Sequence, residues 1–136
     1  MGNVLVRGGL AVLALCVVGW LAVGYRADRL TTDGERALAA AHNPPIPPAL
    51  GQKGLNDLRD AQWLNVDENL RVDEGELSLF LGKRAEAVAI AREVTAAEPD
   101  NVRGWFLAYL AERGAATRHA RDEVRRLDPW AGAPLR

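Results

Sequence analysis

The chain has 136 residues and a formal net charge of −1, so it has room for one small domain and no excess charge that would attract nucleic acid. Its single cysteine, Cys16, excludes an internal disulfide. Alanine is abundant after residue 25, whereas β-branched and aromatic residues are sparse. This composition predicts an all-α protein, and the preference for Arg and Ala is typical of a GC-rich bacterial genome.

Residues 8–25, "GGLAVLALCVVGWLAVGY", form an apolar run without a charged side chain. Their number is close to the minimum for a helix that crosses a hydrocarbon core of ~30 Å. Trp20 and Tyr25 lie toward the end of the run, where amphipathic rings prefer the membrane interface. The alternative is a cleaved signal peptide, but "AVGYRADR" lacks a small-x-small cleavage site.

We therefore expect a single transmembrane helix in residues 1–26, retained in a bacterial plasma membrane and in contact with lipid through residues 8–25. Arginines flank the run on both sides, so the side of the membrane that holds the rest of the chain stays open.

Residues 27–48 are expected to form a juxtamembrane helix and a proline-rich linker. The segment up to Ala41 favours a helix, and the prolines of "HNPPIPPAL" end it. Thr32 or Asp33 is a suitable cap for a new helix. Whether this helix continues the membrane helix is left open. His42 lies at the boundary and is expected to be solvated.

Residues 49–130 contain a series of helix patterns separated by short stop signals. Asp67 is a suitable N-cap, Gly82 ends the helix that follows, and Pro99 ends the next one. In the segment after Pro99, the apolar residues recur with the spacing of a single helix face. They are Val102, Trp105, Phe106, Tyr109 and Leu110. Residues 131–136 form a tail.

The spacing of these signals indicates a repeat, because "LNVD" at 64–67 and "AEPD" at 97–100 occupy equivalent places between helices. Gly82, Ala87, Val94 and Pro99 resemble the second half of a tetratricopeptide repeat, a two-helix unit of about 34 residues. Trp105 resembles the bulky residue that opens the next unit. The resemblance implies a short α-solenoid of helical hairpins over residues 49–130.

The chain departs from the family pattern in the helix after Asp67. Arg71 and Glu74 stand where the family has bulky apolar residues, and only Gly75 fits. The last unit is also shorter than the family's spacing. The resemblance is therefore to a degenerate array of two to three repeats.

A concave surface lined by the first helix of each pair is what the resemblance implies for binding. An extended or helical peptide would lie there, with Phe106 as an apolar anchor. The alternative is that Phe106 and Leu110 are buried against a neighbouring helix. The residues expected to face the groove are Asn69, Val72, Glu76, Arg103, Phe106 and Leu110.

No set of residues indicates catalysis, a cofactor or a metal. The acidic residues between 67 and 76 are better explained as a solvated helix face, and the two histidines lie far apart in sequence. The arginines between 113 and 126 could contact phosphate, lipid or an acidic peptide. They are better explained as the polar outer face of the last helix of the array.

These observations predict a membrane-anchored protein–protein interaction module without enzyme activity, whose partner is another protein or a peptide. The alternative is a structural accessory subunit of a polytopic membrane complex, for example one that assembles a cell-envelope polymer. Membrane proteins of that kind resemble this chain in carrying such repeats after a membrane segment.

Overall fold

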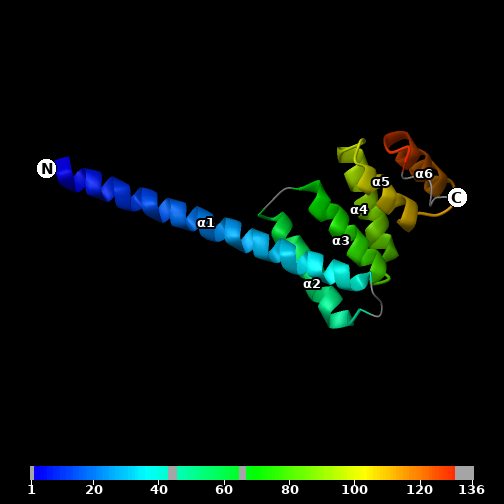
Figure 1. The fold of residues 1–136 in the computed structure, drawn as a ribbon, viewed down its shortest axis with the longest axis horizontal. Coiled ribbons are helices and arrows are strands. Elements are labelled where there is room, and N and C mark those ends of the chain that lie inside the picture. Colours follow the sequence, from blue (N-terminus) through cyan, green and yellow to red (C-terminus); the bar gives the residue numbers. More distant parts are fainter. Residues whose placement is uncertain (1, 43–45, 65–66, 131–136) are drawn as a thin grey trace.

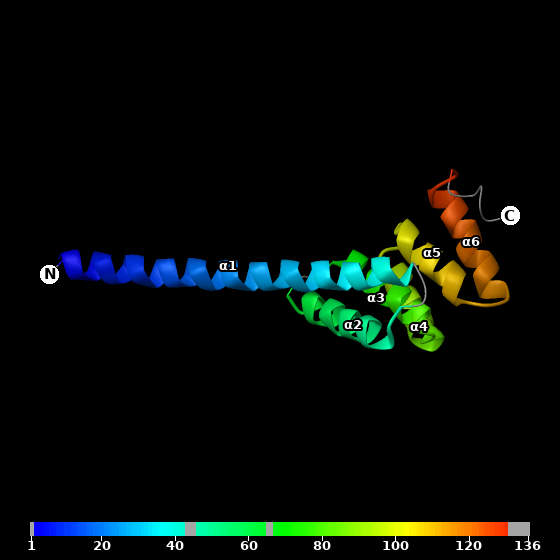
Figure 2. The same cartoon turned by 60° about the horizontal axis from the view of Figure 1, so that its bottom comes forward.

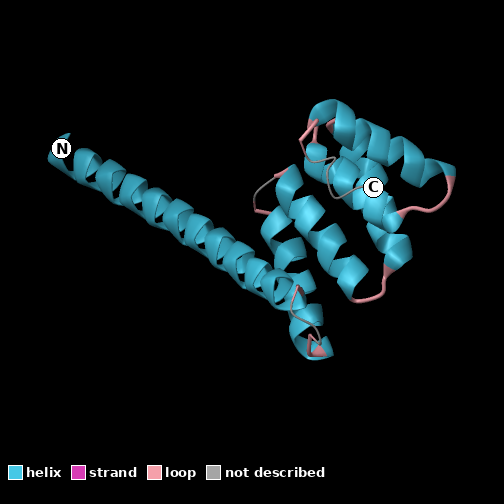
Figure 3. Cartoon of the chain, turned by 45° about the vertical axis from the view of Figure 1, so that its right-hand side comes forward, coloured by secondary structure: helices cyan, strands magenta, loops and turns pink. Residues whose placement is uncertain are grey.

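The computed structural model describes residues 2–42, 46–64 and 67–130, and it leaves the side chains of residues 2–9, 11 and 68 undescribed. Over these residues the chain forms six α-helices and no strand, which confirms the all-α prediction (Figure 3). The predicted tail at 131–136 lies outside them. The helices are α1 (Gly2–Ala41), α2 (Pro48–Gln62), α3 (Glu68–Phe80), α4 (Arg84–Ala97), α5 (Val102–Ala111) and α6 (Ala115–Leu127).

Helix α1 is continuous from Gly2 to Ala41, so neither Thr32 nor Asp33 starts a new helix. Its second half packs against α2, whereas its first half projects away from the other helices (Figures 1 and 2). Gly34 is the point where α2 comes close, because a Cβ at Gly34 would lie 2.5 Å from Leu58 Cδ2. In the part of the chain that the structure describes, no helix combines the length and apolar character needed to cross a membrane.

Local signals mark the starts of α3 and α5 and the end of α3. The Asp67 side chain accepts a hydrogen bond from the backbone N–H of Asn69 at 2.8 Å, which starts α3. The Asn101 side chain does the same for Gly104 at 3.0 Å and starts α5. Gly82 has φ +77°, a conformation that glycine adopts without strain, and it follows the end of α3 as predicted.

The six helices pack as three successive pairs, α1 with α2, α3 with α4 and α5 with α6. Further contacts join α2 to α3 and α4 to α5. The first helices of the pairs also touch, since α3 contacts both α1 and α5. Among the described residues, the backbones of α2, α4 and α6 do not approach one another closely, although an ion pair between Arg59 and Glu86 joins α2 to α4. Helices α1, α3 and α5 therefore form one layer of the molecule, and their exposed side is a surface shared between pairs.

The buried side chains form two clusters. One joins α3, α4, α5 and α6 through Val72, Ala87, Ile90, Ala91, Val94, Leu107, Ala108, Ala111 and Ala120. The other joins α1, α2 and α3 through Ala37, Leu38, Ala41, Leu55, Leu58, Ala61, Leu70 and Leu77. The core thus begins within α1, so residues of the expected juxtamembrane segment belong to the helical array.

Helix α5 buries a different face from the one that its large apolar residues predict. Its buried residues are Gly104, Leu107, Ala108 and Ala111. A Cβ at Gly104 would lie 2.7 Å from Val94 Cγ1, so the small residues of α5 face α4. Phe106 and Leu110 are displaced toward the outside and remain 38% and 41% exposed. The alternative in which these two side chains are buried is wrong.

Candidate protein-interaction site

The strongest candidate site lies where α3 and α5 run next to each other. Arg103 of α5 donates to Asp73 of α3 with 2.5 Å between Nη2 and Oδ1. The same nitrogen lies 3.5 Å from Glu76 Oε1. One arginine therefore ties two acidic residues of α3 to α5 while remaining nearly half exposed itself. This arrangement keeps a polar group at the surface between the helices.

Large apolar side chains lie on both helices beside this charged group. Phe80 of α3, one turn after Glu76, is 47% exposed, and its ring contacts the His42 ring at a centroid distance of 4.9 Å. Phe106 of α5, one turn after Arg103, contacts the Tyr109 ring at 6.2 Å. We call the surface formed by Asn69, Glu76, Phe80, Arg103, Phe106 and Leu110 the α3–α5 face.

Val72 does not belong to this surface. It is fully buried in the core cluster with Ala87, Ile90 and Leu107, so the expectation that it lines a groove requires correction. The reason is that α4 and α5 both pack against the side of α3 that carries Val72. Asn69, by contrast, is exposed at the start of α3, and its side-chain amide donates to Asp67 at 3.1 Å.

The surroundings of Glu76 on this surface shift the pKa of its carboxyl group. Burial raises the pKa of its carboxyl group, whereas the charge of Arg103 acts in the opposite direction. The nearby Asp73 carboxylate raises the pKa further, and His42 lowers it. A carboxylate and a guanidinium beside exposed rings can recognise a polypeptide, since the rings bind an apolar side chain and the charges determine its register.

The sequence did not single out Phe80, and His42, which was expected to be solvated, is exposed. The structure brings the two rings together next to Glu76. For Phe80 the signal was available, because it lies four positions after Glu76 and therefore shares its helix face. For His42 no local signal existed, since its position depends on how α1 packs against α3.

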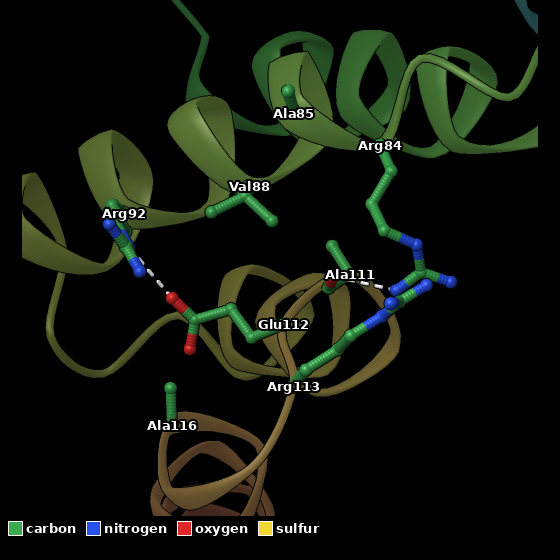
Figure 4. A pocket seen from close by; sticks show the side chains of 8 residues that line it. All are labelled: Arg84, Ala85, Val88, Arg92, Ala111, Glu112, Arg113 and Ala116. Atoms are coloured by element: carbon green, nitrogen blue, oxygen red, sulfur yellow. Dashed lines mark hydrogen bonds and ion pairs between the residues drawn. The ribbon is translucent and has the colours of Figure 1, made fainter.

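A separate pocket of about 480 Å³ lies between α4 and the turn from α5 to α6 (Figure 4). Val88, Ala85 and Ala116 supply apolar lining. Arg84 donates to the backbone carbonyls of Leu110 and Ala111 at 3.2 and 2.7 Å and so caps α5.

Two further charged side chains line this pocket and pair with each other. Arg92 donates to Glu112 with 2.7 Å between Nε and Oε1. Arg113 is the third arginine of the lining, and it forms no hydrogen bond or ion pair within the described part of the chain. The polar groups of this pocket are mostly engaged in holding helices together, so the α3–α5 face is the better candidate for binding.

No group of three or more His, Cys, Asp or Glu side chains in the described ranges is arranged to hold a metal ion. Comparison of the chain with protein-family models, with curated proteins and with solved structures gave no match.

Proposed function

We propose that the chain is a membrane-anchored protein–protein interaction module. The apolar run of residues 8–25 in α1 holds it in the membrane as a single-pass helix, and a tetratricopeptide-like array of helical hairpins holds another protein or a peptide. The observation that carries the proposal is the α3–α5 face, where half-exposed Phe106 and Leu110 lie beside the Glu76–Arg103 pair.

The membrane anchor is supported by the chemistry of the first half of α1. Its described large apolar side chains are exposed, including Leu15 at 72% and Trp20 at 75%, and the other described helices leave them uncovered. An apolar surface of this length is unfavourable in water, whereas lipid or another apolar helix would cover it. The uncharged run of residues 8–25 has the composition for this role.

The helical array is supported by the positions that carry the family resemblance. Gly82 adopts a positive φ at the turn between α3 and α4, and Ala87 is fully buried. Gly75 lies where α3 meets α5, because a Cβ there would be 2.3 Å from Leu107 Cδ2. The contacts of α3 with α1 and α5 are those that stacked hairpins need in order to present one common face.

An accessory subunit of a membrane complex is the second candidate. Gly19 and Gly24 of α1 favour it, because a Cβ at either position would meet no atom within 4 Å. Small residues on an exposed apolar helix allow the helix of a partner to approach closely. In this function the partner is held by α1, and the α3–α5 face is not required.

Affinity purification of the full chain from its native membranes separates the two functions. We expect Phe106→Ser to remove the partner protein, whereas Gly19→Leu combined with Gly24→Leu leaves it bound, because both variants keep the apolar run. The opposite pattern would favour the accessory subunit. Trp130→Ser is the matched control, since Trp130 is an exposed aromatic residue outside both surfaces.

A further inference from the structure

We propose that Trp63 and Leu64, which follow α2, lie in the interfacial layer of the same bilayer that holds the apolar run of α1. The helical array would then touch the membrane at a second place. This inference rests on the proposed membrane anchor and assigns a partner, the lipid interface, to a surface that anchoring alone does not require.

The pairing of α1 with α2 brings the end of α2 to the apolar run. The two helices are antiparallel, since Gly54 lies against Ala37 and Leu58 lies against Gly34. Helix α2 thus runs back along α1 in the direction of the N-terminus (Figure 2). The end of α2 therefore lies beside the last residues of the apolar run and the residues of α1 that follow them.

Two pockets define this junction. One of about 290 Å³ is lined by Trp63 and Leu64 together with Val23, Arg26, Leu30 and Asp60. The other, of about 430 Å³, is lined by Leu64 together with Trp20, Val23, Gly24, Ala27, Asp28 and Thr31. Leu64 therefore borders the apolar run directly, and Trp63 lies beside its last residues.

Three of the exposed side chains near this junction are aromatic. Trp63 is 92% exposed, Trp20 is 75% exposed and Tyr25 is 70% exposed. Tryptophan and tyrosine prefer the membrane–water interface, because their rings are apolar and their N–H or O–H groups remain hydrated. Trp20 and Tyr25 are about 7.5 Å apart along α1. Trp63 lines a pocket with Val23, which lies between them in the helix, so a single interfacial layer can accommodate all three rings.

Charged residues of the same junction determine the depth. Arg26 and Asp60 line the pocket that Trp63 lines. The hydrocarbon core would penalise both charges strongly, whereas bulk water would leave the indole of Trp63 fully hydrated. The interfacial layer satisfies both groups, and we therefore assign this depth rather than the core. Contact at α1 and α2 together would restrict how the α3–α5 face can tilt relative to the membrane.

Single-tryptophan variants of the full chain test the inference. Three of the four tryptophans are replaced by Phe, so that only Trp63, Trp20 or Trp130 remains, and each variant is reconstituted into phosphatidylcholine vesicles that contain brominated lipids. We expect the Trp63 emission to be shifted to the blue and quenched by bromine close to the headgroups. Trp130 is the matched control, because it is 90% exposed but follows α6, which lies far from the first half of α1 (Figure 1).

The Trp20 variant distinguishes failure of the inference from failure of the anchor. If lipid quenches Trp20 while Trp63 emits like Trp130, the second contact is wrong and the anchor stands. If lipid quenches neither, the anchor and the second contact are both wrong. A blue-shifted Trp63 that lipid does not quench, in a chain that crosslinks to itself, would assign this surface to a second copy and overturn the inference.

A second measurement leaves Trp105 in place, because its indole N–H donates to the Pro99 carbonyl at 2.7 Å and Trp105→Phe would remove this hydrogen bond. In a Cys16→Ser background, Leu64→Cys is compared with Leu110→Cys. The two leucines are 39% and 41% exposed. Vesicles that contain either variant are exposed to a water-soluble maleimide both inside and outside. We expect the cysteine of Leu64→Cys to react several-fold more slowly than that of Leu110→Cys. Equal rates would overturn the inference.

Discussion

The Glu74 carboxylate of α3 accepts a hydrogen bond from Arg59 of α2, with 2.8 Å between Oε1 and Nε, although the Glu74 side chain is only 2% exposed. Gln62 donates to the other carboxylate oxygen at 3.0 Å, and Arg71 donates to it at 2.5 Å. Arg59 also pairs with Glu86 of α4. A buried charge on α3 thus connects three consecutive helices. Its burial is tolerated because both carboxylate oxygens, which have lost their contact with water, accept hydrogen bonds from other side chains.

Removal of this carboxylate should destabilise the helical array strongly. We expect Glu74→Ala to lower the free energy of unfolding by about 3 kcal/mol, because it leaves Arg59 and Arg71 without their shared partner. Glu93 is the matched control, since it also accepts from Arg71 at 2.5 Å but is 59% exposed. Glu93→Ala should cost less than about 1 kcal/mol. Equal losses in denaturant unfolding of the full chain would contradict this assignment.

The pH dependence of stability should separate Glu74 from Glu76. Burial opposes ionisation of Glu74, but hydrogen bonds from Arg59 and Gln62 and the charge of Arg71 outweigh it and lower its pKa. The stability that ionised Glu74 provides is therefore present above the ordinary value of 4.5 and is lost as the pH falls through the lowered pKa. For Glu76 burial raises the pKa, so its contribution is lost as the pH rises through the raised value.

Two matched variants measure these opposite signs. Relative to the original chain, Glu74→Gln should lose most stability at neutral pH and progressively less in acid. The unfolding free energy of Glu76→Gln, relative to that of the original chain, should be highest at neutral pH and lower in acid. The measurement is the unfolding free energy from urea titrations at a series of pH values. A parallel pH dependence for the two variants would show that the surroundings of the two carboxylates do not differ in this way.

Close approach of α1 and α2 depends on Gly54. A Cβ at this position would lie 2.2 Å from Ala37 Cβ, and the neighbouring Leu77 Cδ2 would be 3.3 Å away. We expect Gly54→Ala to destabilise the pair by about 1–3 kcal/mol through overpacking. Adding Ala37→Gly should restore part of this loss, since it removes the opposing methyl group.

Gly24→Ala serves as the control for helix propensity, because a Cβ at Gly24 meets nothing within 4 Å. It should leave thermal unfolding of the array unchanged or raise its midpoint slightly, because alanine favours a helix more than glycine does. Failure of Ala37→Gly to compensate would mean that the two helices do not meet at this register.

The C-terminal end of α5 is held by Arg84 of α4, which donates to the carbonyls of Leu110 and Ala111. Arg84→Met should cost about 1–2 kcal/mol, since these are hydrogen bonds from a charged donor. Hydrogen exchange of the amides near the end of α5 should accelerate. Arg113→Met is the control, because it changes the same pocket but removes no hydrogen bond or ion pair of the described residues. It should leave hydrogen exchange of these amides unchanged. Equal protection in both variants would rule out the capping role.

The sequence predicted the helix boundaries well where the deciding interactions are local. Asp67 caps α3 and Gly82 follows its end, as predicted, and both depend on residues within a few positions. The continuity of α1 was not predictable in this way. It passes through Gly34, whose missing side chain matters only because Leu58 of α2 occupies the space.

Arg71 and Glu74, which depart from the tetratricopeptide pattern, also depend on interactions with residues that are distant in sequence. As a pattern they are charged residues at positions where an apolar side chain is expected. In the structure they neutralise each other with Arg59, which is distant in sequence. The family resemblance assigned Val72 to the groove, but its burial depends on α4 and α5. A helix pattern shows which residues share a face, whereas the neighbours decide which face is covered.

Site-specific photocrosslinking from the α3–α5 face tests the central proposal most directly. A photoreactive residue is placed at Phe106 in the full chain in its native membrane, with Ala96 as the control because it is exposed on α4 outside this face. We expect a discrete adduct with one polypeptide from position 106 and none from position 96. Equal crosslinking from both positions, or none from position 106, would contradict a binding role for this surface.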